Sequence, residues 1–174
     1  MAERPTTDQL KQLVIDYSAG CGLDPNIALI QVARESANFR PDVVYGSFVG
    51  GAGEKGMTQF TPGTWARFGS GPQDNAYDPN YAMGAYCGYM KYLLGLFGDY
   101  ERALQGYNGG EGNVQRGTVS AAARRYASEV IAQAQKGEIT SSGSDQGDHD
   151  TGSSLLTWLA IGGAIAVVWV LVDD

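Results

Sequence analysis

The sequence predicts a mainly α-helical head followed by one apolar helix near the C-terminus. Apolar residues recur at helical spacing through most of residues 1–137. Two Asp-Pro pairs, beginning at Asp24 and Asp78, are typical of an N-cap followed by a first-turn proline. The length of 174 residues suits one domain with a remainder, and no repeat of about 20 to 50 residues divides the head.

Each helix of the head is predicted from an N-cap residue at its start, an apolar face and a residue that ends it. A threonine pair starts the first helix, and glycines from Gly20 to Gly22 end it. The second helix is apolar nearly all round, so we expect it to cross the core with Glu35 near its C-terminal end. Helix starts are expected at Thr6 or Thr7, Asp24, Thr61, Asp78 and Thr118, with a further short helix reaching Gln105.

Between Asn38 and Gly56 the sequence loses its helical period. Glycines are frequent in this stretch, and glycine clusters are typical of turns and loops. We therefore expect a small loop or hairpin lobe here, between two helical parts of the head.

Residues 155–172 form an apolar run without a charged side chain. As a helix this run would be about 27 Å long, close to the thickness of the hydrocarbon core of a bilayer. Trp158 and Trp169 lie near its ends, where interfacial aromatic residues are expected. Residues 138–154 are acidic and rich in Gly and Ser, which is typical of a flexible tether. The sequence thus predicts a head at 1–137, a linker at 138–154 and a transmembrane helix at 155–172 that binds a lipid bilayer.

The charge distribution argues against a nucleic-acid partner. The formal net charge is −7, but residues 1–137 carry all 12 Lys and Arg side chains against 13 of the 19 acids, which leaves a net charge of −1. Binding to nucleic acid requires a basic surface. The head has no such excess of basic residues, so we expect no nucleic-acid partner.

Histidine and cysteine usage excludes several classes of enzyme. His149 is the only histidine, so the chain lacks the histidines of a zinc hydrolase and those of an enzyme with a catalytic Ser-His or Cys-His pair. For an enzyme, carboxylate chemistry is what remains. Cys21 and Cys87 allow one disulfide, but the polar stretch from Met1 to Lys11 is not a signal peptide, which favours two reduced core thiols.

Glu35 is the first candidate for a catalytic residue. A carboxyl at the end of an apolar helix is desolvated, which raises its pKa and keeps a proton available near neutral pH. The competing interpretation is a surface glutamate paired with Arg34 or Arg40. Glycine-bounded polar side chains at Gln59 and at Tyr107-Asn108 favour a sugar-binding cleft.

Four segments of the chain resemble the catalytic domain of soluble lytic transglycosylases (SLT), a branch of the lysozyme superfamily. The segments are ALIQVARESANF, GMTQFTPGTW, YDPNYAMGAYCGYMKYL and ALQGYNGGEGNV, and together they cover most of the head. The resemblance implies a mainly α, lysozyme-like fold of the goose-type or SLT kind and a cleft that binds the glycan strands of bacterial peptidoglycan. It assigns the catalytic acid to Glu35 and substrate-binding positions to Ser36, Gln59, Tyr107 and Asn108.

The resemblance also implies a reaction that uses one carboxyl. Glu35 would protonate the oxygen between N-acetylmuramic acid and N-acetylglucosamine, and would then accept the proton of the muramic acid 6-hydroxyl as a 1,6-anhydro ring closes. A hydroxyl of Tyr107 near Glu35 would help to orient it. The implied reaction needs no metal site and no organic cofactor.

The chain departs from the family pattern next to Gln59. The family's G-L-M-Q is G-M-T-Q here, and the stretch between Ser47 and Gln59 is a few residues longer and includes Glu54. A solvated loop charge is the preferred interpretation of Glu54. If it faces Glu35, Glu54 would act as a second carboxylate in a hydrolytic muramidase, as would Asp42. A third alternative is a non-catalytic protein that binds glycan or has a structural role in a virion membrane.

The combination of head and anchor resembles the tail-anchored transglycosylases of membrane-containing phage virions. The resemblance implies a single-pass protein of the virion membrane, with virion membrane or capsid proteins as partners. It would act on the periplasmic wall of the host during genome entry. An enzyme of a conjugation or secretion system is the alternative setting.

Overall fold

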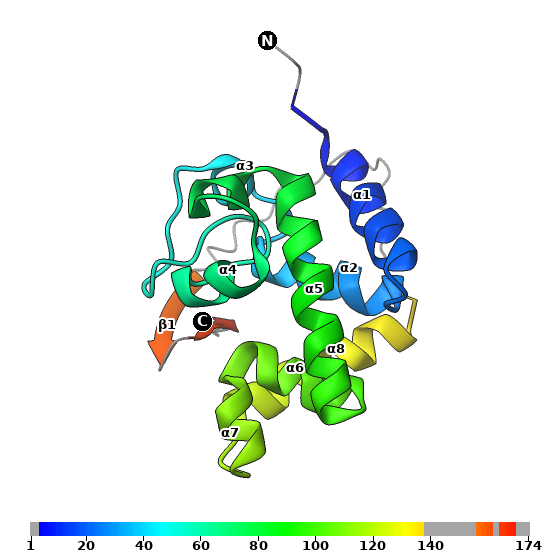
Figure 1. The fold of residues 1–174 in the computed structure, drawn as a ribbon, viewed down its shortest axis with the longest axis vertical. Coiled ribbons are helices and arrows are strands. Elements are labelled where there is room, and N and C mark those ends of the chain that lie inside the picture. The colour runs from blue at the N-terminus through cyan, green and yellow to red at the C-terminus, as the bar shows by residue number, and fades with distance from the viewer. Residues whose placement is uncertain (1–3, 138–155, 162–163, 170–174) are drawn as a thin grey trace, which may run out of the picture.

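The computed structural model describes residues 4–137, 156–161 and 164–169, and it confirms a mainly α-helical head (Figure 1). In chain order the elements are α1 (Thr7–Gly20), α2 (Pro25–Glu35), α3 (Pro41–Tyr45), α4 (Pro62–Phe68), the 3₁₀ helix η1 (Gln73–Tyr77), α5 (Pro79–Phe97), α6 (Tyr100–Gly109), α7 (Glu111–Gln115), α8 (Ala121–Gln135), β1 (Leu156–Ile161) and β2 (Ala164–Trp169).

Most helices begin where the sequence predicts. The Thr6 side chain accepts the N–H of Gln9, and the Gln9 side chain accepts the N–H of Thr6, so α1 begins with a capping box. The last helix begins later than predicted, because Ser120 rather than Thr118 accepts the N–H of Ala123, at 3.1 Å. The predicted starts at Asp24, Thr61 and Asp78 are confirmed, since each side chain accepts a first-turn N–H.

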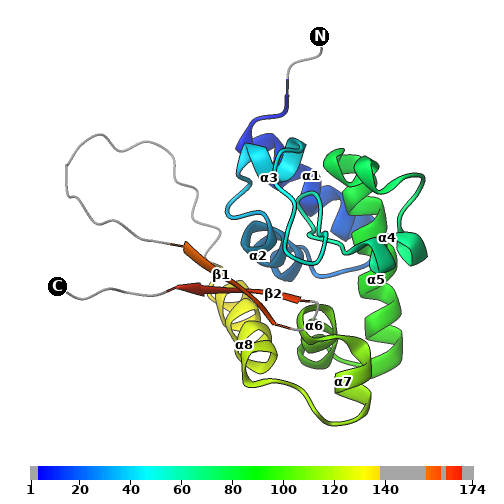
Figure 2. The same ribbon diagram turned by 90° about the vertical axis from the view of Figure 1, so that its left-hand side faces the viewer.

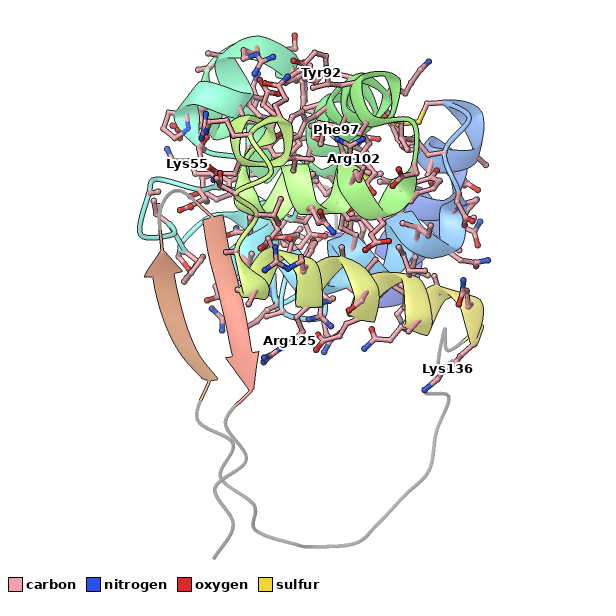
Figure 3. The ribbon with its side chains drawn as sticks, turned by 90° about the horizontal axis from the view of Figure 1, so that it is seen from below. Lys55, Tyr92, Phe97, Arg102, Arg125 and Lys136 are labelled. Carbon is pink, nitrogen blue, oxygen red and sulfur yellow. A yellow bond between two sulfur atoms is a disulfide. The ribbon has the colours of Figure 1, made fainter. Side chains whose placement is uncertain are left out.

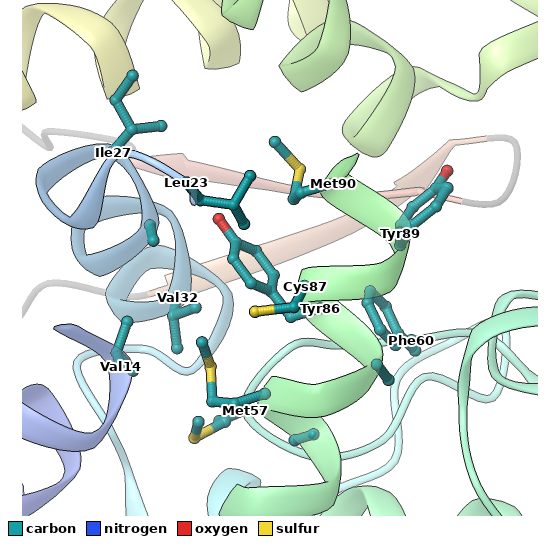
Figure 4. Packing of buried hydrophobic residues seen from close by; sticks show 14 of the residues in the cluster. Val14, Leu23, Ile27, Val32, Met57, Phe60, Tyr86, Cys87, Tyr89 and Met90 are labelled. Atoms are coloured by element: carbon teal, nitrogen blue, oxygen red, sulfur yellow. The ribbon is translucent and has the colours of Figure 1, made fainter. Parts of the chain in front are cut away.

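Helix α5 is the central element of the head (Figure 1). It contacts α1, α4, α6 and η1, while α2 contacts both α1 and α8. Figure 4 shows Tyr86 and Met90 of α5 facing Leu23, Val32 and Met57, and all five side chains are buried. The prediction that α2 crosses the core is confirmed, because six of its 11 residues are buried.

The small lobe expected between Asn38 and Gly56 is present. It contains the one-turn helix α3, whose inner face is made by the buried Val43 and Val44. An isolated antiparallel bridge between Lys55 and Phe60 follows. The lobe is therefore a loop with a short helix and one bridge, rather than a full hairpin.

The single helix predicted for 155–172 is not confirmed. The described parts of this run are β1 and β2, which pair antiparallel with Leu156 opposite Trp169, and β2 contacts α6 and α8 (Figure 2). Two apolar halves, the second of them rich in Val, are separated by a Gly-Gly pair and match the pattern of a β-hairpin as well as that of an apolar helix. None of the helices described is long and apolar enough to cross a membrane. The linker predicted at 138–154 lies outside the described residues.

The expectation of two reduced cysteines is wrong. Cys21 and Cys87 form a disulfide, with their Cα atoms 6.2 Å apart. Cys21 is the C-cap of α1 and Cys87 lies within α5, and these two helices pack together, which brings the thiols within bonding range. The pairing of these two cysteines follows from the packing of α1 on α5, which the sequence of Met1 to Lys11 does not report.

We expect the disulfide to stabilise the head considerably. It joins residues 66 positions apart, and closing a loop of this size stabilises a folded protein by about 2–4 kcal/mol. The double variant Cys21→Ser, Cys87→Ser should lower the free energy of unfolding by that amount, measured by urea unfolding. Wild-type protein kept in reductant should behave like the variant. Equal urea midpoints for the oxidised protein and the variant would contradict the prediction.

Candidate active site

Glu35 is the last residue of α2, and only 8% of it is exposed. Ser36 follows as the C-cap and is fully buried. The Ser36 hydroxyl donates to the carbonyl of Val32 at 2.7 Å and accepts the N–H of Phe39 at 2.9 Å. Ser36, expected to contact substrate, is thus placed where it supports the turn that carries Glu35.

The chain reverses immediately after the Glu35-Ser36 pair through an uncommon backbone conformation. Ala37, Asn38 and Phe39 have φ angles of 50°, 60° and 60°, and Gln59 has a φ of 49°. Non-glycine residues in this left-handed region are strained by about 1–3 kcal/mol each, and such strain concentrates at functional sites. Three of these residues therefore follow Glu35 and Ser36 directly, and the fourth is Gln59 itself.

The hydrogen-bond partner of Glu35 is Tyr126 of α8. The Tyr126 hydroxyl donates to Glu35 Oε1 at 2.5 Å, and both side chains are buried. Burial raises the pKa of Tyr126 well above its usual value, so the phenol stays protonated and remains a donor. Tyr126 therefore holds the carboxyl of Glu35 in one orientation.

Neither arginine expected near Glu35 forms an ion pair with it. Arg34 pairs with Glu129 at 2.7 Å, and its guanidinium lies 5.6 Å from the centre of the Tyr126 ring. Arg40 instead makes two hydrogen bonds to Asp42, at 2.6 and 2.9 Å. The interpretation of Glu35 as a surface glutamate in an ion pair is therefore wrong, and Asp42 is already occupied by an arginine.

The surroundings of Glu35 favour its protonated form. Burial, the largest effect, raises the pKa of Glu35 from 4.5 to about 7. The hydrogen bond from Tyr126 and the positive charge of Arg34 lower this pKa, and the negative charge of Glu54 raises it. A carboxyl with such a pKa can both donate and accept a proton near neutral pH, as general acid–base catalysis requires.

The Gly56–Gln59 turn and the end of α6 meet beside this carboxyl. The Tyr107 hydroxyl donates to the carbonyl of Thr58 at 2.6 Å, so Tyr107 does not have the role in orienting Glu35 that the sequence suggested. Gly56 has a φ of 72°, and a Cβ there would lie 1.8 Å from the Ala76 carbonyl oxygen, so only glycine fits. The hydrogen bond from Tyr107 to Thr58 thus joins the predicted Tyr107-Asn108 motif to the predicted Gly56–Gln59 motif.

Polar atoms without partners gather in the same turn. Gln59 donates through Nε2 to the Gly56 carbonyl at 2.8 Å, whereas its Oε1 is buried and has no hydrogen-bond partner among the described residues. The same holds for the hydroxyl of Thr58. Asn108, next to Tyr107, is buried and belongs to α6 rather than to this turn. The unpaired atoms of Thr58 and Gln59 cost free energy, and they mark the turn as a candidate contact for a ligand.

Glu54 is not the solvated loop charge that the sequence favoured. Only 2% of the residue is exposed, and its Oε2 accepts the N–H of Ala52 at 2.8 Å. The backbone carbonyl of Glu54 accepts the N–H of Gly50 at 2.9 Å, which folds the extra residues into a tight loop. The loop turns the carboxylate inward, close enough for its charge to act on Glu35.

Metal-ligating side chains do not cluster in the described part of the chain. No group of three or more His, Cys, Asp or Glu residues there is arranged to hold an ion. The arrangement that is present, one carboxyl with a raised pKa beside the phenols of Tyr126 and Tyr107, is suited to proton transfer to and from a bound ligand.

The family model of the transglycosylase SLT domain matches residues 12–130. The chain belongs to this family. Curated proteins gave no match. Among solved structures, the head resembles the 70 kDa soluble lytic transglycosylase of Escherichia coli, with 23% identity and a TM-score of 0.56. It also resembles an inactive mutant of the lytic transglycosylase Slt of Pseudomonas aeruginosa, with 18% identity and a TM-score of 0.60.

Each of these two matches covers 71% of this chain and 23% of the other chain, so the protein spans about a quarter of the length of either enzyme. At this level of identity the likeness shows the fold. The lysozyme-like SLT fold expected from the four sequence segments is therefore confirmed for the head.

Sequence reasoning on this SLT domain found Glu35 but missed Tyr126. Tyr126 recurs on the apolar face of the last helix, where a tyrosine is indistinguishable from an ordinary core residue. The signal that distinguishes it is its hydroxyl, which needs a buried partner. That partner is Glu35 of α2, which is 91 residues away in the sequence.

We expect Tyr126→Phe to raise the pKa of Glu35 above about 7, because it removes a hydrogen bond that stabilises the charged carboxylate. Loss of one such bond should move the pKa by about one unit. The basic limb of the pH–activity profile should shift upward by the same amount, as should a ¹³C NMR titration of the glutamate carboxyl carbons. Tyr17→Phe is the matched control, because Tyr17 donates to Asn80 on the exposed surface. An unchanged or lower pKa would contradict the assigned role of Tyr126.

Proposed function

We propose that the protein is a lytic transglycosylase that cleaves the β-1,4 bond between N-acetylmuramic acid and N-acetylglucosamine in peptidoglycan. The observation that carries this proposal is the buried carboxyl of Glu35, with a pKa of about 7, hydrogen-bonded by Tyr126 inside an SLT domain. The names of the two similar structures, both lytic transglycosylases, support it.

One carboxyl suffices for the complete reaction. Glu35 donates its proton to the glycosidic oxygen, the bond from that oxygen to C1 of muramic acid breaks, and N-acetylglucosamine leaves with a 4-hydroxyl. The N-acetyl group of the substrate stabilises the positive C1. Ionised Glu35, still held by Tyr126, then takes the proton of the muramic acid 6-hydroxyl as O6 bonds to C1. The 1,6-anhydro ring closes without water, and Glu35 is protonated again.

The experiment compares wild type with Glu35→Gln on purified peptidoglycan and analyses the products by mass spectrometry. We expect fragments ending in 1,6-anhydro-muramic acid from wild type and a loss of at least about 100-fold in rate for the variant, because general acid–base catalysis contributes 10²–10⁴-fold. Fragments that carry one extra water would indicate a hydrolase. Binding of peptidoglycan without cleavage by wild type would indicate a non-catalytic glycan-binding or structural protein.

A hydrolytic muramidase is the second candidate, and the burial of Glu54 favours it. An inverting hydrolase needs a second carboxylate as a base for the attacking water. Glu54 is 2% exposed, and the salt bridges of the described residues give it no cationic partner. Asp42, the other candidate base, is held by Arg40. The two variants Glu54→Gln and Asp42→Asn therefore separate the mechanisms. A hydrolase should lose water-containing products in the first variant and keep them in the second, whereas a transglycosylase should keep anhydro products in both.

The apolar run at 155–172 supports a further part of the proposal, attachment to a lipid bilayer. The run has no charged side chain, and a surface this apolar is unfavourable in water. The Cys21–Cys87 disulfide suits a head that works in an oxidising compartment. We place the protein in the membrane of a phage virion, beside virion membrane or capsid proteins, where it would open the host cell wall for genome entry.

We expect the full chain to float with phospholipid vesicles in a density gradient, and a variant lacking residues 155–172 to remain at the bottom. Recovery of both forms with the vesicles would place the lipid contact on the head, and recovery of neither would contradict attachment. Fractionation of bacteria that express the gene alone tests the setting. Export of the protein in the absence of any phage would contradict the virion assignment.

A further inference from the structure

A series of aromatic rings leads from the active site to the surface of the head. The Tyr107 ring, whose hydroxyl bonds to the Gly56–Gln59 turn, lies 5.4 Å from the Tyr89 ring between centroids. Tyr89 lies 4.9 Å from Phe68, and Phe68 lies 5.4 Å from Tyr92. Tyr89 is buried, whereas 37% of Tyr92 is exposed. Figure 3 shows Tyr92 on the side of the head opposite Arg125 of α8.

Arg67 lies over the outer end of this series. Its guanidinium carbon is 5.0 Å from the centroids of both the Phe68 and the Tyr92 rings. Its Nη1 donates to Glu111 Oε1 at 3.0 Å, while 50% of the side chain remains exposed. A guanidinium has five N–H donors in one plane. Arg67 is therefore fixed by two rings and one carboxylate, with donors still free to face solvent.

Glu111 holds Arg67 through a salt bridge, although one of its own carboxylate oxygens has no partner in the part of the chain that the structure describes. It is the first residue of α7 and follows Asn108 of the active site by three positions. Its second oxygen, Oε2, is buried and has no hydrogen-bond partner within the described ranges. An unsatisfied buried carboxylate oxygen is destabilising, and such costs are tolerated mainly where they serve a site. The pair also links α4 to α7, the helices that follow Gln59 and Asn108 along the chain.

A pyranose ring fits the chemistry of this cluster. Its axial C–H bonds form an apolar face that packs on an aromatic ring, and its equatorial hydroxyls reach hydrogen-bonding groups at the ring edge. The negative charge of Glu111 offsets the positive charge of Arg67, so the cluster favours a neutral ligand over an anion. An N-acetylglucosamine unit meets both requirements, and the polymeric glycan strand places further such units beyond the one being cleaved.

We propose that Phe68, Tyr92 and Arg67 form an outer saccharide subsite, held in place by Glu111, that binds an N-acetylglucosamine unit of the glycan strand away from the reacting bond. The inference rests on the proposed function, since it names a second contact for the same substrate. The subsite adds affinity only for a glycan long enough to reach from Glu35 to Tyr92, and it therefore selects strands over short fragments.

The test measures binding rather than turnover. The Glu35→Gln variant serves as the parent, and isothermal titration calorimetry gives its affinity for N-acetylglucosamine oligomers of increasing length. Adding Tyr92→Ala should weaken binding of the long oligomers about two- to twelvefold, as expected for loss of one aromatic contact of about 0.5–1.5 kcal/mol. It should leave the shortest oligomer that binds unaffected. Tyr92→Phe, which keeps the ring, should restore the affinity.

Tyr81→Ala is the matched control. Tyr81 lies on the same helix, is 47% exposed, and is about 16 Å from Tyr92 along the helix axis. Its loss should change nothing. Equal affinities of the Tyr92→Ala and Tyr81→Ala variants for long oligomers would overturn the subsite. A parent that binds no oligomer at all would instead overturn the proposed function on which the subsite rests, so the two failures are distinguishable.

Discussion

The burial of a single ionisable carboxyl at the end of an apolar helix is the constraint around which the head is organised. Because α2 crosses the core, its last residue, Glu35, is buried, and the nearby Arg34 pairs with Glu129 rather than with it. Such a group is tolerated only with a fixed partner, and α8 supplies one through Tyr126. The left-handed turn that begins at Ala37 then takes the chain away from the core. Helix packing, backbone strain and proton affinity are thus parts of one arrangement.

A second carboxylate, that of Glu54, acts on the Glu35 carboxyl through its charge. In a site with Glu35 alone, the sugar's own hydroxyl is the available nucleophile, and the product is a ring. Glu54 adds a buried negative charge in a loop tightened by its own backbone and side-chain hydrogen bonds. A negative charge there favours the protonated form of Glu35 in either mechanism. Glu54 therefore influences the proton affinity of Glu35, and in the hydrolytic alternative it would also select water as the nucleophile.

The helices and the catalytic candidate, Glu35, were predictable from local sequence signals. The side chains that pair with one another across the fold were not. An aspartate before a proline fixes a helix start from residues adjacent in sequence, as at Asp24, and the apolar length of α2 buries Glu35 by itself. The hydrogen bond from Tyr126 to Glu35 and the Cys21–Cys87 disulfide depend on which helices pack together. The periodicity of apolar residues along the sequence does not predict which helices pack together. The inward turn of Glu54 depends on hydrogen bonds within its own loop, and composition predicts only that the loop is polar. The run at 155–172 is ambiguous for a related reason, because apolar β-branched residues suit both an apolar helix and a hairpin.

The raised pKa of Glu35 makes folding of the head a proton-binding reaction. In the unfolded chain this carboxyl titrates near its ordinary value of 4.5, and in the folded head near 7. Between these values the folded form holds more protons than the unfolded form, so the free energy of unfolding falls as the pH rises. The loss amounts to about 3 kcal/mol by the time the pH exceeds 7, and none of it is present well below 4.5. Glu35, the residue that we propose as the catalytic acid, thus contributes least to the stability of the fold above pH 7, whereas in mild acid it is protonated and its contribution is retained.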